Sequence, residues 1–361
     1  FGELNGFAQS GTAVDAGISK EKINTTEFGA NLAFFKNRLR FDAAYFITKS
    51  TNLITFTTPS VTSGSTNYLT NIGEIEGKGL ELTLGGTVLQ SKNNDFSWDL
   101  SVNYSANEAV VKSITEGVNE ITIESSGTFG VFAIVGEAFP QIKASSYVRD
   151  PQGNVVIDAA SGNPKVGGLK NLGKTTPDYI LGLTSSLNYK NWNLSTTMDY
   201  RTGHVYYEQG SDAMEFTGRS VESASSGRQD FVFPNSVIET SPGVFTPNTN
   251  IPVTDGRQDF WTNTYNEIKE NYVKDATAFK IRELALNYNI SKKYLENTPL
   301  KSFRIGLVGR NILTLLPKEN RFSDPEFNNT RSTDDQNAIG IGGYFQSPPT
   351  TSYGFSLNVE F

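Results

Sequence analysis

A period of two runs through this sequence and constrains its fold more than any other feature. Large apolar residues alternate with small or polar ones, as in β-strands that face two different environments. The alternation is clearest where Phe96, Trp98 and Leu100 are separated by polar residues. Nine segments follow the pattern and are predicted to be strands: 27–34, 39–47, 80–84, 96–104, 179–189, 192–200, 279–290, 303–307 and 353–361.

The connections between these segments alternate between short and long. Short polar turns follow the first, third, fifth and seventh segments, whereas the others are followed by long stretches at about 51–70, 107–176, 203–275 and 314–350. Long structureless loops count against a compact soluble domain. Short turns on one side and long loops on the other are typical of an outer-membrane β-barrel. The sequence therefore predicts an all-β chain that forms a transmembrane antiparallel barrel with long extracellular loops.

Three local features refine this interpretation. Phe279 and Ile281 are odd-numbered whereas the next apolar residue, Leu284, is even-numbered, and this change of phase predicts a β-bulge. Asp-Pro-Gln-Gly-Asn at 150–154 is a strong turn signal, predicted to tip a small hairpin over 147–158. The Gly-, Ala- and Ser-rich first 22 residues lack periodicity and are predicted to be a loop.

Composition excludes several classes of function. Lys and Arg number 31 against 38 Asp and Glu, and a net charge of −7 argues against a nucleic-acid partner. The chain has no Cys, which excludes disulfides and Cys-ligated metals, and its single His204 argues against a zinc cluster or a Ser-His-Asp triad. No local motif proposes a catalytic carboxylate pair. We therefore expect neither an enzyme nor a bound cofactor.

The last predicted strand ends the chain on an aromatic residue. A soluble protein usually lets its last residues fray in water. An apolar terminal strand that ends on Phe is instead the signal that an outer-membrane β-barrel presents to its assembly machinery. The residues expected to form this signal are Tyr353, Phe355, Leu357, Val359 and Phe361.

Four motifs occur in order along the chain. Asn-Ile-Gly-Glu-Ile-Glu-Gly-Lys-Gly-Leu-Glu at 71–81 precedes Leu-Gly-Lys-Thr-Thr-Pro-Asp at 172–178, Val-Gly-Arg-Asn-Ile-Leu-Thr at 308–314 and Pro-Pro-Thr-Thr-Ser-Tyr-Gly-Phe at 348–355. They resemble the N-x-G-x-x-x-N-K-G-x-E, L-G-x-x-x-P-D, x-G-x-N-L-x-T and P-x-x-R-x-Y-x-F motifs of SusC/RagA-type TonB-dependent transporters. Three positions depart from these motifs: Gly77 replaces Asn, Ile312 replaces Leu and Thr351 replaces Arg.

The resemblance implies a fold, a location and a set of partners. That family closes a barrel of about 22 strands around a plug, so residues 1–361 are expected to be its C-terminal part, without the plug, TonB box and N-terminal strands. The lack of a signal peptide agrees with this expectation. The implied activity is TonB-dependent import of oligosaccharides or oligopeptides across the Gram-negative outer membrane. The implied partners are the rest of the transporter, a SusD-like lipoprotein, TonB–ExbB–ExbD, outer-membrane lipids and the barrel assembly machinery.

Aromatic residues of the long loops are the best substrate-binding candidates, because sugar rings and peptide side chains both pack on aromatic faces. These candidates are Tyr206, Tyr207, Phe231, Phe233, Phe260, Trp261 and Tyr265. The alternative is that they pack the loops together or against the lid protein, since a pocket uses few of the aromatics around it. The sequence leaves both interpretations open.

Charged residues within the predicted strands are expected to face a wet lumen as solvated wall or plug contacts: Glu81, Asp99, Arg282 and Glu283. Two acidic stretches, at 323–326 and 334–335, lack the spacing of a calcium loop and are interpreted as ordinary loops. The glycine-rich stretch at 339–344 follows no strand and opens no helix, which argues against a phosphate loop.

Two other functions remain open at this stage. A TonB-dependent receptor for siderophores or cobalamin would have the same fold, and only the four motifs favour the importer of larger nutrients. A soluble secreted adhesin with a β-sandwich core would bury the same apolar strand faces against each other instead of in lipid.

Overall fold

The computed structural model describes residues 11–57, 59–71, 73–93, 95–115, 117–326, 339–343 and 349–361. Most of the sequence features introduced above lie within these ranges. Outside these ranges lie the first ten residues of the predicted N-terminal loop, Ile72 and Pro348 of the motifs, Tyr344 of the glycine-rich stretch, and parts of the long stretches, including Asp334 and Asp335.

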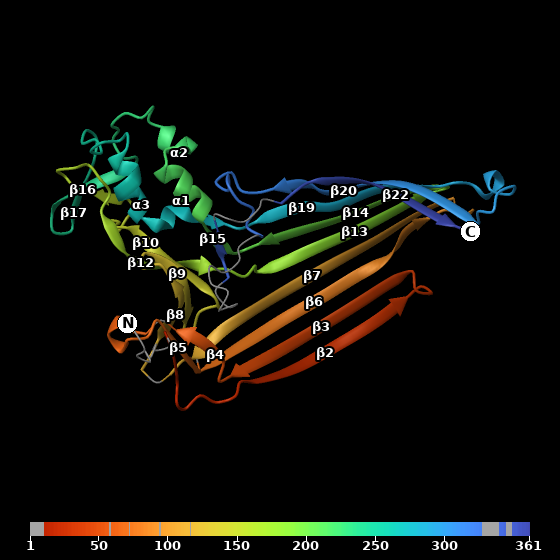
Figure 1. Ribbon diagram of the computed structural model, residues 1–361, viewed down its shortest axis with the longest axis horizontal. Coiled ribbons are helices and arrows are strands. Elements are labelled where there is room, and N and C mark those ends of the chain that lie inside the picture. The colour runs from red at the N-terminus through yellow and green to blue at the C-terminus, as the bar shows by residue number, and fades with distance from the viewer. Residues whose placement is uncertain are drawn as a thin grey trace, which may run out of the picture.

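One large antiparallel sheet forms most of the chain, and its strands run side by side in sequence order (Figure 1). All nine predicted strands are present in it, which confirms the prediction from the alternation. They are β2 (Lys22–Phe34), β3 (Leu39–Thr51), β6 (Glu74–Gln90), β7 (Phe96–Ser113), β13 (Tyr179–Tyr189), β14 (Trp192–Thr202), β19 (Ala278–Asn289), β20 (Ser302–Leu315) and β22 (Ser352–Glu360).

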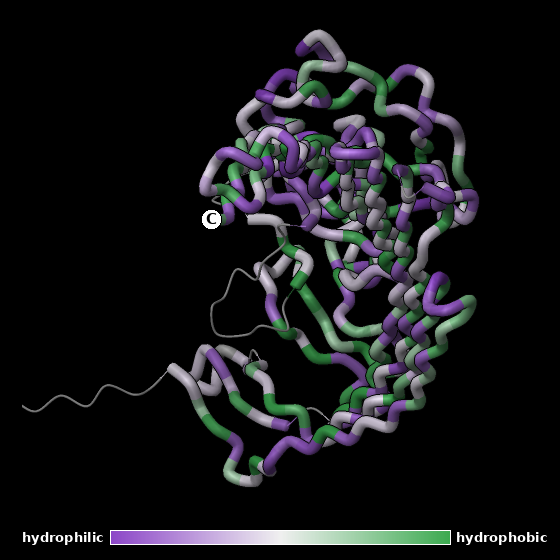
Figure 2. The backbone as a smooth tube through the Cα atoms, turned by 90° about the vertical axis from the view of Figure 1, so that its right-hand side faces the viewer, coloured by the Kyte–Doolittle hydropathy of each residue, from purple (hydrophilic) through white to green (hydrophobic). Residues whose placement is uncertain are grey.

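The sheet is a curved, open wall. Figure 2, which looks from the end with the short turns, shows the chain as an arc with one open side. Strands β2 and β22 are the two edges, each hydrogen-bonded to a single neighbour in the sheet. The apolar side chains of β22 are solvent-exposed, with Tyr353 82% and Phe355 68% accessible. The described residues therefore form part of a barrel rather than a closed one.

Some strands are longer than the alternation predicts. Strands β6 and β7 contain 17 and 18 residues, and β2 begins at Lys22 rather than at Glu27. In the last part of β7 the alternation disappears, with Asn107 and Glu108 adjacent. Val111 in this part of the strand is fully buried against residues of the long connections, so the strand there no longer separates one apolar environment from one aqueous one.

The register across the sheet keeps each face uniform. Leu183 pairs with Val102 on one neighbouring strand and Met198 on the other, so these apolar side chains form a row across one face. The predicted bulge is confirmed, because β19 has one extra residue, Arg282, between Ile281 and Glu283, where these pair with the consecutive residues Met198 and Thr197 of β14. One added residue there moves the apolar positions from odd to even without turning the polar face outward.

Aromatic side chains lie near both ends of the apolar face. Tyr179 stacks on Tyr104 at the end with the long loops. At the opposite end Trp192 contacts Tyr288, with ring centroids 4.6 Å apart. Tyr179 and Tyr189 begin and end the same strand, so the two belts are roughly 25 Å apart along a tilted barrel, which is the height of the apolar band in such proteins.

The long connections fold into a second body beyond the strand ends (Figure 1). It contains four small sheets and three short α-helices, α1 (Gln209–Phe216), α2 (Val221–Ala224) and α3 (Tyr265–Glu267). Within the described ranges, no helix is both long and apolar enough to cross a bilayer. The additional strands are β1 (Thr12–Val14), β4 (Ile54–Thr57), β5 (Asn67–Asn71), β8 (Glu120–Ser125), β9 (Phe129–Ile134), β10 (Gln141–Tyr147), β11 (Val155–Ile157), β12 (Val166–Lys174), β15 (Val205–Glu208), β16 (Ser236–Ser241), β17 (Val244–Pro247), β18 (Val273–Asp275) and β21 (Ile341–Gly342).

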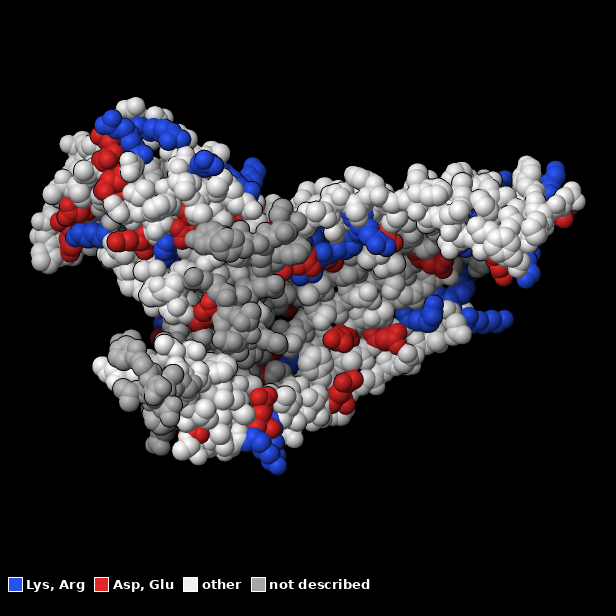
Figure 3. All heavy atoms as spheres, in the orientation of Figure 1, with Lys and Arg blue, Asp and Glu red and all other residues white. Residues whose placement is uncertain are grey.

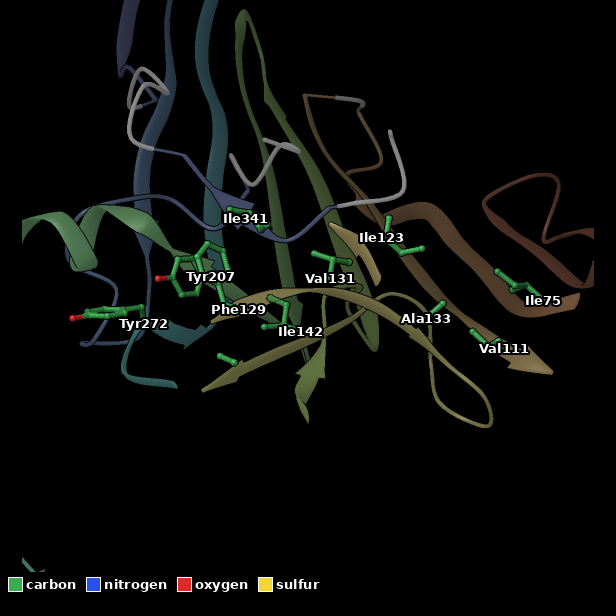
Figure 4. Packing of buried hydrophobic residues seen from close by; sticks show 11 residues of the cluster. Ile75, Val111, Ile123, Phe129, Val131, Ala133, Ile142, Tyr207, Tyr272 and Ile341 are labelled. Atoms are coloured by element: carbon green, nitrogen blue, oxygen red, sulfur yellow. The ribbon is translucent and has the colours of Figure 1, made fainter. Parts of the chain in front are cut away.

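Most of the buried apolar side chains lie in this loop body rather than in the large sheet. Val131, Ala133 and Ile142 of β9 and β10 are at most 1% exposed. Figure 4 shows Ile142 beside Phe129 and Tyr207, in a cluster that joins segments far apart in the sequence. The loop body therefore has its own hydrophobic core.

The interpretation of residues 107–176 and 203–275 as irregular loops is therefore wrong. Strands β9 and β10 are buried on both faces, so they have short apolar runs, such as Gly-Val-Phe-Ala-Ile at 130–134, instead of alternation. The first 22 residues also contain a strand, β1, which pairs with β5 in parallel. The predicted turn at 150–154 is confirmed: Asp150 Oδ1 accepts hydrogen bonds from the backbone N–H of Gln152 and Asn154.

Candidate functional site

The polar face of the large sheet carries the side chains that line the inside of a barrel of this type. Glu81 lies opposite Ser105, and Asp99 accepts a hydrogen bond from Thr87 Oγ1 at 2.6 Å. A hollow of about 380 Å³ lies on this face, lined by Arg40, Asp42, Thr83, Asp99, Ser101 and Thr184. These hydroxyl and charged groups form a wet wall, as the sequence predicts.

Arg282 and Glu283, also predicted to face the lumen, are ion-paired within the sheet. Arg282 donates to Asp199 on β14, with Nη2 3.0 Å from Oδ2. Glu283 accepts from Arg310 on β20, with Oε2 3.1 Å from Nε. Arg282 also contacts a long loop, which sequence reasoning does not reveal.

Residues 320–326, here called the clamp segment, fold back from the loop after β20 onto the polar face. Lys280 of β19 is ion-paired with both Asp324 and Glu326 of this segment. Arg282 binds Glu326 through two parallel hydrogen bonds of 2.6 and 2.8 Å. Arg201 of β14 adds a third cation, 3.3 Å from Glu326. The loop is thus attached to two neighbouring strands of the wall.

The clamp contains equal numbers of positive and negative side chains, and it is partly buried. Three cations, Arg201, Lys280 and Arg282, meet three anions, Asp199, Asp324 and Glu326. The side chains of Lys280 and Asp324 are only 3% and 4% exposed. The interpretation of residues 323–326 as an ordinary loop is therefore incomplete. Its carboxylates are taken up by cations of the wall, a partnership between positions more than 40 residues apart.

Glu326 stays ionised throughout the physiological range. Burial alone would raise the pKa of its carboxyl, but hydrogen bonds from Arg282 and Lys280 outweigh burial and lower the pKa to about 2. A carboxyl whose pKa falls on folding stabilises the folded state above its unfolded pKa, near 4.5, and loses that contribution as pH falls towards 2. The Glu326 carboxylate therefore keeps its charge and its ion pairs until the pH falls well below 4.5.

Glu208 forms a second attachment for the clamp segment. Its carboxylate is fully buried. Oε1 accepts hydrogen bonds from the backbone N–H of Ser323 at 2.9 Å and of Phe322 at 3.3 Å, and from the Ser323 hydroxyl at 3.0 Å. Asn320 Nδ2 donates to the carbonyl oxygen of Asp275 at 2.6 Å. The segment is therefore attached both to the sheet and to the loop body.

The seven predicted substrate-binding aromatics are packed against one another or against the loop core. Tyr206, Tyr207 and Phe260 have no exposed surface, and Trp261 is 5% exposed. Tyr207 stacks on Phe129 with ring centroids 3.8 Å apart. In this conformation the three fully buried rings hold the loop body together, which is the packing alternative considered above.

The remaining aromatics keep some accessible surface. Phe231, Phe233 and Tyr265 are partly buried and contact the ring of Phe260, with centroid distances of 5.3, 6.2 and 5.7 Å. Trp261 lines a cavity of about 530 Å³. Polar and charged side chains share that cavity: Glu215, Arg228, Arg257, Gln258, Thr262 and Asn263. Contact of these aromatics with substrate stays a prediction.

Glu215 is the most perturbed carboxyl in this cavity. Its side chain is 2% exposed and its Oε2 has no hydrogen-bond partner. Burial raises its pKa to about 8, against the opposing charge of Lys274 and with support from Glu222 and Asp212. Glu215 is therefore protonated in the folded protein at neutral pH.

Replacing Glu215 by glutamine is expected to stabilise the loop body in a pH-dependent way. The Glu215 carboxyl binds its proton more tightly in the folded state than in the unfolded state. Its contribution to the free energy of unfolding is therefore fully present below about pH 4.5 and is lost as the pH rises through 8. Glutamine has the shape of the protonated side chain but does not ionise. The stability of the variant relative to the unmodified protein should therefore grow by up to about 1.4 kcal/mol per pH unit between pH 4.5 and 8. The thermal midpoint of Glu215→Gln should exceed that of the unmodified protein more at pH 8 than at pH 5. The exposed Glu319→Gln is the control, and equal shifts at both pH values would contradict the assignment.

The residues of the first sequence motif have structural roles. Gly73 has φ +49°, and a Cβ there would lie 2.1 Å from the carbonyl oxygen of Ser113, so only glycine fits. A Cβ on Gly79 would meet the ring of Phe46 at 2.1 Å. Asn71 Nδ2 donates to the carbonyl oxygens of Ser19 and Asn52. The motif thus fixes where β6 begins and how the polar face packs beside it.

The sheet, its two uniform faces and its unequal connections define the class as a partial β-barrel. The family described as TonB dependent receptor-like, beta-barrel matches residues 1–312, and the chain belongs to this family. The chain is 25% identical to TonB-dependent receptor P3 of Formosa agariphila over an alignment that covers 99% of this chain and 36% of that receptor. It is 25% identical to TonB-dependent receptor SusC of Bacteroides thetaiotaomicron over 58% of this chain and 22% of SusC.

A solved structure has the same fold. The RagAB peptide transporter superposes with a TM-score of 0.69 at 16% sequence identity, over 94% of this chain and 35% of the matching one. The chain therefore spans about a third of the length of the relatives it matches. These comparisons confirm the recognition of the SusC/RagA type and the fold class.

Proposed function

We propose that the chain is the C-terminal part of the barrel of an outer-membrane, TonB-dependent importer of large nutrients. The observation that carries the proposal is the nine-stranded sheet with one polar and one apolar face, matched along almost its whole length by a RagAB chain. Such a wall, with long loops at one end, suits transport rather than catalysis. The short turns at one end and the long loops at the other support an orientation with the loop body outside the cell and the short turns in the periplasm.

The remainder of the transporter is proposed as the first partner. Residues 1–361 would be the C-terminal part of the receptor, and the plug, the TonB box and the other barrel strands would lie elsewhere in the protein. Strands β2 and β22 have edges that a closed barrel would pair. The exposed apolar residues of β22, such as Phe355, and the exposed Phe361 that follows the strand support a role as the assembly signal.

The proposed substrates are oligopeptides or oligosaccharides, delivered by a SusD-like surface lipoprotein and imported with energy from TonB–ExbB–ExbD. The names of two relatives support this class, since one is SusC and the other is the RagAB peptide transporter. Within this chain the cavity beside Trp261 combines an aromatic edge with Arg228 and Arg257, groups that suit a peptide carboxylate or sugar hydroxyls.

Affinity purification of the intact transporter tests this proposal. A tag on the transporter in its native membrane should co-purify a surface lipoprotein in stoichiometric amount, because a SusD-like lid binds the loop body. The same purification after deletion of the lipoprotein gene is the control for non-specific capture. A transporter that is purified alone from gently solubilised membranes, while importing its substrate in cells, would point to a receptor for siderophores or cobalamin.

A further inference from the structure

The outer, apolar face of the sheet has a groove close to the short turns. It has a volume of about 340 Å³ and is lined mainly by apolar side chains; its principal residues are Arg38, Leu39, Leu84, Gly86, Leu100 and Val102. The register of the neighbouring strands explains why the groove forms. Leu39, Gly86 and Leu100 lie in one row across three strands, so the glycine leaves a gap between two leucines.

Glycine at this position is required by the turn beside it. A Cβ on Gly86 would lie 2.1 Å from the carbonyl oxygen of Arg38. The turn between β2 and β3 is itself unusual, because Phe35, Lys36 and Asn37 all have φ between 53° and 67°. Residues other than glycine rarely adopt this left-handed conformation, so the surroundings must hold this turn in place.

Arg38 is fixed at the rim of the groove. Its carbonyl oxygen accepts a hydrogen bond from the N–H of Thr87 at 3.0 Å. Its guanidinium lies close to the same residue, with Nη2 3.5 Å from the Thr87 carbonyl oxygen. A cationic head thus lies at the end of an apolar groove, on the face that meets lipid.

The charge at this end of the molecule is opposite to that of the whole. The four short turns, 35–38, 91–95, 190–191 and 290–301, contain seven Lys or Arg and two acidic residues, so they carry 7 − 2 = +5 in a chain of −7. Figure 3 shows blue side chains gathered at the tip of the sheet on the right. None of the seven forms an ion pair with another residue in the described part of the chain, whereas twelve other Lys and Arg do. The seven are Lys36, Arg38, Lys92, Lys190, Lys292, Lys293 and Lys301.

We propose that the groove binds one acyl chain of an anionic phospholipid, whose phosphate is held by Arg38 with Lys36. The apolar lining suits a hydrocarbon chain, the rim suits a phosphate, and the unpaired cations of the neighbouring turns favour an anionic headgroup over a zwitterionic one. The site rests on the proposed membrane location, since only there does the outer face meet lipid. It would anchor the periplasmic rim of the barrel at one fixed depth.

The test is lipid retention by the intact transporter, taken from nanodiscs of equal phosphatidylglycerol and phosphatidylcholine and analysed by native mass spectrometry. Phosphatidylglycerol should be retained preferentially. Each basic residue near a lipid surface contributes about 1 kcal/mol, so Lys36→Ala with Arg38→Ala should weaken retention about 30-fold. Leu100→Trp, which fills the groove without altering charge, should also abolish it. Lys190→Ala, in a turn that does not line this groove, is the matched control.

Several outcomes would overturn the proposal. Equal retention of both lipids, or unchanged retention in the double variant, would remove the headgroup site. An equal loss in Lys190→Ala would assign the effect to the overall charge of the turns rather than to the groove. The membrane location is tested separately by flotation with vesicles: a transporter that floats but retains no lipid contradicts only this inference, and one that does not float contradicts the proposed function too.

Discussion

Replacing Lys280 by methionine is expected to release the clamp segment from the barrel wall. Lys280 is the cation that binds Asp324, whose side chain is 4% exposed. Removing one partner of a buried ion pair leaves the other charge without compensation and costs about 3–5 kcal/mol. Glu326 would still bind Arg282, so the segment should loosen from its Asp324 end rather than lose every contact.

Hydrogen exchange at the amides of Phe322 and Ser323 measures this release, since both donate to Glu208 when the segment is docked. A cost of 3 kcal/mol predicts exchange faster by at least about 100-fold. Lys49→Met is the matched control, because Lys49 is 50% exposed in its pair with Glu74. Such a surface pair is worth about 1 kcal/mol or less.

A second substitution separates charge from packing. Lys280→Met with Asp324→Leu removes both buried charges and leaves apolar groups, an exchange that is often neutral or stabilising. Slow exchange should therefore return in the double variant. If Lys280→Met behaves like Lys49→Met, or if the double variant exchanges as fast as the single one, the ion pair does not hold the segment.

The large sheet could be predicted from the sequence because its two faces meet different environments. Apolar and polar residues therefore alternate along each strand and show which side chains lie on which face. A change in the phase of this alternation, such as that between Ile281 and Leu284, indicates the bulge directly. Strand ends could not be predicted in the same way. The last part of β7 packs against the loop body, with Val111 fully buried, so it has no alternation between an apolar and an aqueous face.

The secondary structure of the loop body could not be predicted from the sequence, and the reason is physical. Its central strands β9 and β10 are short and buried on both sides, so Phe129–Ile134 has an apolar run that a helix or a loop could also contain. The clamp could not be predicted because ion pairs between distant segments leave no local pattern in the sequence. Nothing in the sequence near Glu326 indicates that it binds Arg282. The aromatic residues illustrate the same limit, since composition cannot distinguish Phe260 in a core from Trp261 beside a cavity.

Introducing arginine in place of Leu183 is expected to destabilise the transporter in a bilayer. Leu183 lies in the row formed with Val102 and Met198, between the belts marked by Tyr179 and Tyr189. This is the middle of the proposed lipid-facing band. A charge at that depth costs about 2–4 kcal/mol, because the guanidinium must either lose its hydration or draw water and headgroups inward. Denaturant unfolding of the reconstituted transporter gives the difference directly.

The neighbouring residue provides a control that separates the lipid face from the polar face. Thr184 pairs with Ser101 and Thr197, so its side chain points to the opposite side of the same strand. Thr184→Arg should change stability far less, because the lumen of a barrel is wet. The two variants have the same added charge one residue apart, and the order of their effects decides which face meets lipid. In a soluble sandwich the apolar face would meet protein: Leu183→Arg would then destabilise the protein equally in detergent-free buffer and in lipid.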